Sequence, residues 1–230
     1  MRLFLSIKCL IYIIRMKKIC SKYLCLFLFL IVCLPVVAQK ELKPLTSIDG
    51  FQERLKKEAA SLSSIESDFT QEKYLDVFND KIISKGRFYY RQENKIRMDY
   101  TTPVDYQIII NGQKLKIVSE GKSNVVNLGS NRMMDEMKGM LAACMVGDLS
   151  SITSTYKLDY YESPSLYVVK IRPVSKSVQA YISEIIISIN KEDMSVQTLR
   201  LSENEKDYTE YRFTNRKYNT LTNDEKFIIR

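Results

Sequence analysis

The side chains best suited to acid–base chemistry in this sequence are carboxylates, because histidine is absent from all 230 residues. No carboxylates stand out as a catalytic pair, and any acid is a candidate to the same degree as Glu72, Asp99, Asp159 and Glu162. Nearly all acids lie on the polar faces of expected strands or in turns, which favours solvation. The lack of histidine also excludes Ser-His-Asp and Cys-His catalysis and the usual zinc sites. We therefore expect no catalytic residue, no metal site and no enzyme.

The sulfur-containing side chains suggest packing rather than catalysis. Cys144 has no cysteine partner downstream of residue 38 and lies in an apolar context, so we expect a small buried hydrophobe. Five methionines fall within thirteen residues: Met133, Met134, Met137, Met140 and Met145. An ordinary packed helix is one reading of this cluster. The other is a surface that adapts to guests of variable shape, because methionine is unbranched and polarizable.

The first 38 residues have the layout of a secretory signal peptide, and residues 39–230 form a single expected domain. Lys17 and Lys18 precede a short apolar run, and Ala38 ends an acceptable cleavage site. The run is too short for a spanning helix, and Met16 is the expected start. A lipid-modified Cys33 is the alternative, although Val32 before it is not small. That alternative would make the protein a membrane-anchored acceptor.

Removal of this segment changes the charge of the chain. Six of the 35 basic residues lie in residues 1–38, which leaves 29 against 27 acidic residues, a net charge of +2 rather than +8. The balanced charge gives no support to nucleic-acid binding. Since Cys144 alone remains, no internal disulfide is possible, and stability must come from a packed core, for which about 190 residues suffice.

Two stretches have helical periodicity. The first predicted helix covers 48–62, with Ser47 or Asp49 as its cap, and its apolar face holds Phe51, Leu55, Ala59 and Leu62. The second contains the methionine cluster and ends at Gly147, after which Asp148 is expected to cap a short helix.

The rest of the chain alternates between apolar and polar residues and predicts about eleven strands. They comprise a long strand from Ile65, then 82–91, 95–100, 106–110, 115–118, 124–128, 156–161, 167–173, 182–190, 195–201 and 208–215. Asn111 and Gly112 mark a tight hairpin. Most strands have one apolar face, which predicts either a sandwich of two sheets or a curved single sheet around a hollow. Two helices are too few to fill a large hollow but are enough to cover one.

Several stretches, in order along the chain, resemble the periplasmic outer-membrane lipoprotein carrier proteins, the LolA-like family. They are SSIESDFTQEKYL, GRFYYR, KIRMDYTTPVDYQIIINGQKL and the final YRFTNRKYNTLTNDEKFII. Gln92 stands where a proline is common in the family, and Met98 replaces a frequent tryptophan. The resemblance spans essentially the whole chain after the signal peptide.

The resemblance implies a mainly β fold, an unclosed antiparallel β-barrel of about 11 strands with a helical lid over an apolar cavity. It implies a monomeric periplasmic chaperone that shelters lipoprotein acyl chains between the inner and outer membranes, without a cofactor. The implied partners are acylated lipoproteins, an inner-membrane lipoprotein-releasing transporter, and an outer-membrane acceptor or the outer membrane itself. A secreted hydrolase of lipid or glycan is the runner-up from another class.

The resemblance and the alternation together predict a cavity lining and a latch. The lining residues are Phe69, Phe88, Tyr90, Ile96, Met98, Tyr100, Ile108, Met137, Met140 and Leu141. Arg91 matches a family arginine that closes the lid by hydrogen bonds to the helix backbone, and Arg97 is the alternative latch. A third reading is that both arginines are simply solvated on the outer face, which the alternation of their strands favours.

Overall fold

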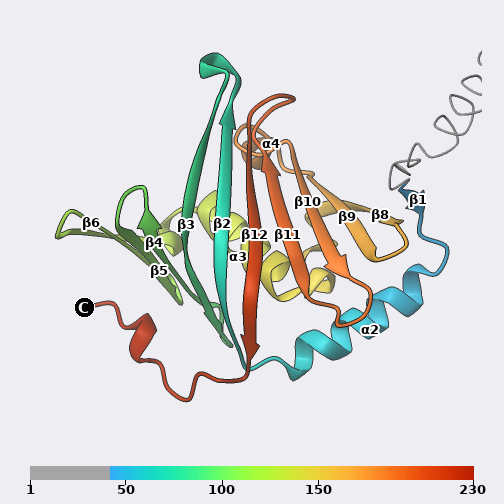
Figure 1. The fold of residues 1–230 in the computed structure, drawn as a ribbon, viewed down its shortest axis with the longest axis horizontal. Coiled ribbons are helices and arrows are strands. Elements are labelled where there is room, and N and C mark those ends of the chain that lie inside the picture. The colour runs from blue at the N-terminus through green and yellow to red at the C-terminus, as the bar shows by residue number, and fades with distance from the viewer. Residues whose placement is uncertain (1–41) are drawn as a thin grey trace, which may run out of the picture. The chain divides into compact units, whose positions relative to one another are not determined.

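The computed structural model describes residues 42–230, and the predicted signal peptide, Met16 and Cys33 lie outside them. This part of the chain forms one antiparallel sheet of 12 strands in the order β1-β8-β9-β10-β11-β12-β2-β3-β4-β5-β6-β7 (Figure 1). Within the described residues, the end strands β1 and β7 do not pair with each other, so the sheet is not closed. The predicted unclosed sheet is confirmed, and the sandwich alternative is wrong.

The strands agree closely with the alternation of the sequence. They are β1 (Lys43–Pro44), β2 (Ser64–Leu75), β3 (Asp80–Arg91), β4 (Lys95–Thr102), β5 (Tyr106–Asn111), β6 (Lys114–Ser119), β7 (Lys122–Asn127), β8 (Tyr156–Glu162), β9 (Leu166–Pro173), β10 (Glu184–Asn190), β11 (Val196–Ser202) and β12 (Tyr208–Tyr218). The additional strand β1 was not predicted from the sequence, and its two residues pair with β8.

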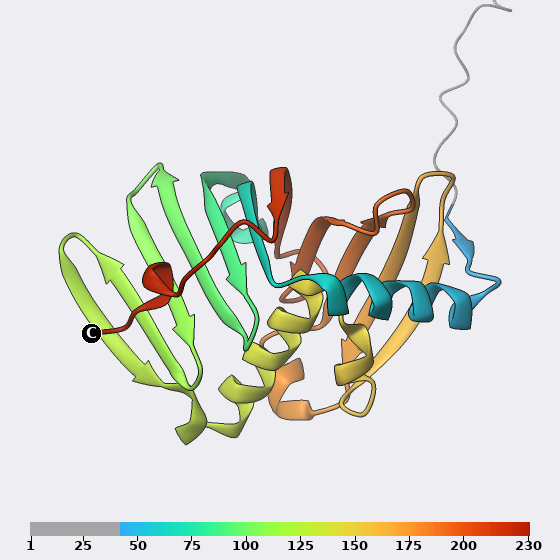
Figure 2. The same cartoon turned by 90° about the horizontal axis from the view of Figure 1, so that it is seen from below.

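Two helices lie on the same side of the sheet, as Figure 2 shows. They are α2 (Ile48–Ser61), which buries Phe51 and Leu55, and α3 (Arg132–Val146). The short α4 (Lys176–Gln179) was not predicted. No helix within residues 42–230 is long and apolar enough to cross a membrane.

Side-chain capping and a glycine fix the two ends of α3. The Asn131 side chain accepts hydrogen bonds from the backbone N–H groups of Met133 and Met134, which satisfies donors that a helix start leaves free. Gly147 ends the helix with φ of 86°, a conformation that glycine adopts without strain. Ser47 directly precedes α2, and Asp148 directly precedes a short 3-10 helix, Leu149–Ile152, as predicted, but neither makes a side-chain hydrogen bond to the backbone of its helix.

A glycine allows close packing at the centre of the sheet. A Cβ atom at Gly86 would lie 2.1 Å from the Asp99 carbonyl oxygen and 2.8 Å from the Phe69 ring. Gly86 pairs with Phe69 on β2 and with Tyr100 on β4, next to a register shift in β3. The absent side chain leaves room for the Phe69 ring over the backbone of β3.

Candidate functional site

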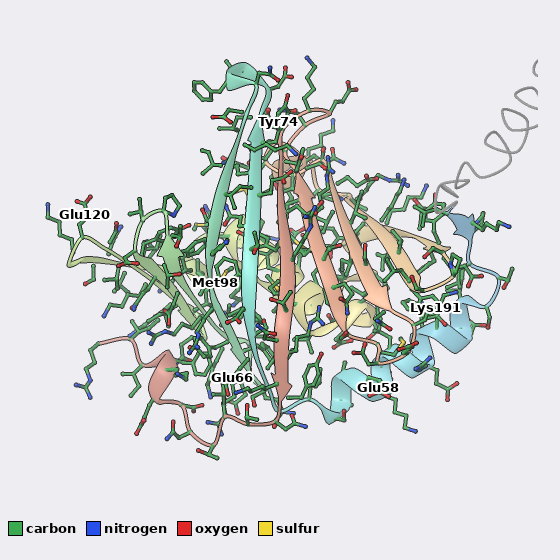
Figure 3. All side chains as sticks on the ribbon, viewed as in Figure 1. Glu58, Glu66, Tyr74, Met98, Glu120 and Lys191 are labelled. Carbon is green, nitrogen blue, oxygen red and sulfur yellow. The ribbon has the colours of Figure 1, made fainter. Side chains whose placement is uncertain are left out.

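The predicted lining residues come together on the concave face of the sheet. Seven of them belong to one buried cluster: Phe69, Phe88, Tyr90, Ile96, Met98, Tyr100 and Met140. The remaining three, Ile108, Met137 and Leu141, are partly buried and pack against that cluster. Figure 3 shows Met98 on the middle of the sheet, with Tyr74 and Glu66 toward the two ends of β2. Their role in binding a ligand stays a prediction.

Strand register explains why these side chains share a face. Phe88 pairs with Met98 across β3 and β4, and Met98 pairs with Ile108 across β4 and β5. Residues directly opposite each other in an antiparallel pair point to the same side of the sheet. The apolar alternation of β3, β4 and β5 therefore adds up to one continuous surface.

Aromatic contacts stiffen this surface around Tyr100. The Tyr100 ring lies 3.9 Å from the Tyr106 ring in a stacked arrangement and 4.9 Å from the Phe69 ring edge-on, measured between centroids. Its hydroxyl donates to Gln71 Oε1 at 2.7 Å. Burial raises the pKa of Tyr100, because a phenolate would lose its hydration there. Tyr100 is therefore a neutral structural group of the wall.

Helix α3 lies against the concave face through its methionines and small residues. Met140 and Cys144 are fully buried, and Ala142, Ala143 and Met145 are nearly so. Burial raises the pKa of the Cys144 thiol, so the reactive thiolate is suppressed. Cys144 is thus a packed hydrophobe on the buried side of α3.

The part of the concave face that α3 covers is filled rather than empty. A cavity between the sheet and the C-terminal end of α3 has a volume of about 30 Å³, enough for one water-sized group. A wider groove of about 510 Å³ lies between α2 and α3, with Ala59, Ala142, Ala143 and Tyr90 among its lining residues. A long apolar chain therefore reaches the part of the concave face that α3 covers only if α3 moves.

Arg91 and Arg97 do not bind the partner that was predicted for the latch, the backbone of the covering helix. Arg91 Nη1 lies 2.9 Å from Asp224 Oδ1, and Arg97 Nη1 donates to the Lys226 carbonyl at 3.0 Å. Both arginines thus bind the segment that follows β12, and neither contacts the backbone of α3. The reason is strand alternation: these arginines point to the outer face, away from the side that α3 covers.

The C-terminal segment forms a small second core on that outer face. Phe227 is fully buried although it lies outside the main cluster, and Tyr89 and Ile109 on β3 and β5 are each 5% exposed. The Phe227 carbonyl accepts a hydrogen bond from Asn111 Nδ2 at 3.0 Å. In Figure 1 the segment, in red, leaves the lower end of β12 toward β4 and β5. This contact was not predicted from the sequence.

The four candidate acids are engaged in polar contacts. Asp159 pairs with Arg172, Glu162 with Lys191, and Asp99 with Arg97. Lys81 and Tyr208 donate hydrogen bonds to Glu72 and lower its pKa. Among residues 42–230, the buried polar side chains are serines, and no group of three metal-ligating residues is present. These acids do not converge on the concave face.

Two polar residues of the concave face, Ser67 and Arg216, were not among the predicted site residues. Both line the cavity of about 30 Å³, and both have a buried polar atom without a hydrogen-bond partner. The predicted alternation of β2 already places Ser67 on the concave face. The arginine departs from the alternation of β12, because the strand changes register just before it.

Comparison with known proteins identifies a family. The family model "Outer membrane lipoprotein carrier protein LolA" matches residues 60–230, and no curated protein matches the chain. Three similar solved structures are a LolA superfamily protein of Nitrosomonas europaea, a putative outer membrane lipoprotein-sorting protein domain of Vibrio parahaemolyticus, and the lipoprotein LppX of Mycobacterium tuberculosis. Their identities are 11%, 8% and 10%, with TM-scores of 0.42, 0.45 and 0.38. They cover 77%, 77% and 75% of this chain, and 97%, 94% and 96% of their own chains.

Proposed function

This chain belongs to the LolA family of outer membrane lipoprotein carrier proteins, and we propose that it carries acylated lipoproteins through the periplasm from the inner to the outer membrane. It acts by binding rather than by catalysis and takes up its cargo as a monomer. The cargo comes from an inner-membrane lipoprotein-releasing transporter. It is delivered to an outer-membrane acceptor or to the outer membrane itself.

The observation that carries the proposal is the kind of contact between α3 and the sheet. Methionines make up much of the covering face: Met140 and Met145 are buried, and Met133 and Met137 are partly buried against the core. Flexible thioether side chains can repack when a guest replaces them. An acyl chain that displaces α3 would exchange one set of apolar contacts for another of similar strength.

This exchange fits the energetics of a carrier. Burial of each CH₂ group is worth about 0.8 kcal/mol, so an acyl chain does not escape into water on its own. A carrier must offer a dry surface comparable to a membrane and release the chain on contact with an acceptor. The contacts of the covering helix compete with the cargo and so keep the affinity of the carrier for acyl chains moderate. The donor transporter then supplies the energy for loading.

A charge on the wall tests the proposal. Met98→Glu on β4 should abolish the ability of the purified chain to keep a defined triacylated lipoprotein in the supernatant after ultracentrifugation. For the same lipoprotein without its acyl chains, neither the unmodified chain nor Met98→Glu should change the amount in the supernatant. Thr101→Glu is the matched control, because Thr101 is exposed on the opposite face of the same strand.

A second variant separates loss of binding from loss of folding. Met137→Glu places the charge on α3, where Met137 is only partly buried, so the fold should tolerate it. Circular dichroism reports whether each variant is folded. Full solubilisation by folded Met98→Glu and Met137→Glu proteins would overturn the proposal.

A further inference from the structure

Strands β2 and β12 change register at one point, close to the C-terminal end of α3. Between the pairs Thr214–Asp68 and Lys217–Glu66, two residues of β12 stand opposite one residue of β2. Such a β-bulge re-aims side chains and is enriched near functional sites. The residues at the bulge are Ser67 on β2, with Asn215 and Arg216 on β12.

The bulge sends its two side chains to opposite faces of the sheet. Asn215 has φ of 53°, and its Nδ2 donates to Asp68 Oδ2 at 2.8 Å on the outer face. Arg216 turns to the concave face and lines the cavity of about 30 Å³. Without the extra residue, strand alternation would place Arg216 on the outer face, like Arg212 and Thr214 before it.

Two hydrogen-bond donors without partners meet this cavity. Ser67 is 6% exposed, and both its hydroxyl and Arg216 Nε are buried without a hydrogen bond. Within residues 42–230 the guanidinium makes one hydrogen bond, from Nη2 to the Phe213 carbonyl at 2.6 Å. Among residues 42–230, no carboxylate forms an ion pair with Arg216. An unsatisfied buried donor destabilises a fold, so two of them at one cavity call for an acceptor that the described residues do not supply.

Apart from Ser195 and Tyr218, the other walls of the cavity are apolar, with Ile65, Phe88, Phe213 and Met145 among them. Met145 belongs to α3, so the cavity opens toward the concave face when α3 moves. The cavity presents a pair of hydrogen-bond donors at one point of an apolar surface, which complements a ligand with a polar head and an apolar tail. A ligand that fits has a hydrogen-bond acceptor where its hydrocarbon chains begin.

We propose that Ser67 and Arg216 bind an ester carbonyl oxygen at the head of the cargo's acyl chains. An ester carbonyl accepts hydrogen bonds and donates none, which matches a hydroxyl and a guanidinium N–H. The pair would fix the depth at which the chains enter the concave face. This inference rests on the proposed function and adds the site that recognises the linkage.

The test compares two lipids that differ only in that carbonyl. One probe is a lipopeptide whose cysteine carries a glyceryl group with two ester-linked palmitoyl chains, and the other has ether-linked hexadecyl chains. Arg216→Met, which keeps an unbranched stem, should weaken binding of the ester probe about tenfold, the usual effect of a hydrogen bond to a charged group. Ser67→Ala should weaken it several-fold, and neither variant should alter binding of the ether probe.

Two matched controls lie on the other face of the sheet. Arg212→Met removes an exposed arginine from the same strand, and Ser188→Ala removes a serine from the outer face of β10. Both should bind the two probes as the unmodified chain does. Thermal unfolding verifies that Arg216→Met is folded, and Ser67→Ala tests the inference independently if it is not.

The outcomes separate this inference from the proposed function. Equal loss of both probes in the variants, or no loss of either, would overturn the carbonyl site while leaving the carrier function standing. Failure of the unmodified chain to bind either probe would overturn the carrier function. A phospholipid with the same two esters is the competitor: equal affinity for it supports the carbonyl site and counts against lipoproteins as the cargo.

Discussion

The Arg91 guanidinium lies 2.9 Å from the Asp224 carboxylate, and this pair ties the outer face of β3 to the segment that follows β12. Lys95 donates to the same carboxylate at 2.9 Å, so two cations on neighbouring strands share one anion. The segment then buries Phe227 beside β4 and β5. The C-terminal segment thus bridges three strands from the side opposite α3.

Phe227 should be the main source of stability in this segment. Phe227→Ala removes a fully buried ring, and such changes usually cost about 3–5 kcal/mol of unfolding free energy. Ile228→Ala is the control, because Ile228 is 46% exposed, and should change stability by less than about 0.5 kcal/mol. Denaturant unfolding measures both. A Phe227→Ala effect no larger than that of Ile228→Ala would contradict the assigned second core.

The Asp224 contacts should make stability depend on acid pH. The hydrogen bond from Lys95, followed by the charge of Arg91, lowers the pKa of Asp224. A folded-state pKa below the unfolded value gives stability that is complete above the unfolded pKa, about 3.9, and is lost as pH falls below it. Asp224→Asn should therefore be less stable than the unmodified chain at pH 7, and the difference should shrink below about pH 4.

Unfolding curves at several pH values check this. Because Asp224 is exposed, salt should reduce the difference at pH 7. A constant difference from pH 7 to pH 3 would show that the carboxylate charge plays no part.

Replacement by alanine should have opposite effects on stability at two glycines of α3, Gly139 within the helix and Gly147 at its end. Gly147 has φ of 86°, and a Cβ there would lie 3.1 Å from Leu55 Cδ1, so Gly147→Ala should destabilise the fold by about 1 kcal/mol or more. Gly139 lies within α3, and a Cβ atom added to it would meet no neighbouring atom within 4 Å, so Gly139→Ala should stabilise by about 0.5–1 kcal/mol. Thermal unfolding distinguishes the two, and equal signs would refute this account of α3.

Much of the fold could be predicted from local pattern. The alternation in β3 and β4 placed Phe88, Tyr90 and Met98 on one face, and the register of the sheet confirms it. The hairpin at Asn111 and Gly112 joins β5 to β6 as expected. Such features depend on neighbours in sequence, where side-chain period and turn chemistry decide the structure.

The parts that sequence reasoning missed depend on contacts between distant segments. Arg91 meets Asp224, which lies 133 residues further along the chain, and nothing in the local pattern of β3 identifies that partner. Arg216 was hidden because a single extra residue in β12 reverses the faces that alternation assigns. The resemblance to a family predicted that Arg91 binds the backbone of the lid helix. Because Arg91 lies on the outer face of the sheet, it pairs with Asp224 instead.

The single cysteine of residues 39–230 should report whether α3 moves when cargo binds. Cys144 is a fully buried residue of α3 and its pKa is raised by burial, so alkylation by a maleimide at pH 8 should be slow in the free protein. If acyl chains displace α3, a saturating diacylated lipopeptide should speed the labelling at least tenfold. The same peptide without acyl chains should have no effect, and Cys144→Ala fixes the background. Slower labelling in the presence of the lipopeptide would mean that the chains bind without displacing α3, and the groove between α2 and α3 would then be the place to look for them.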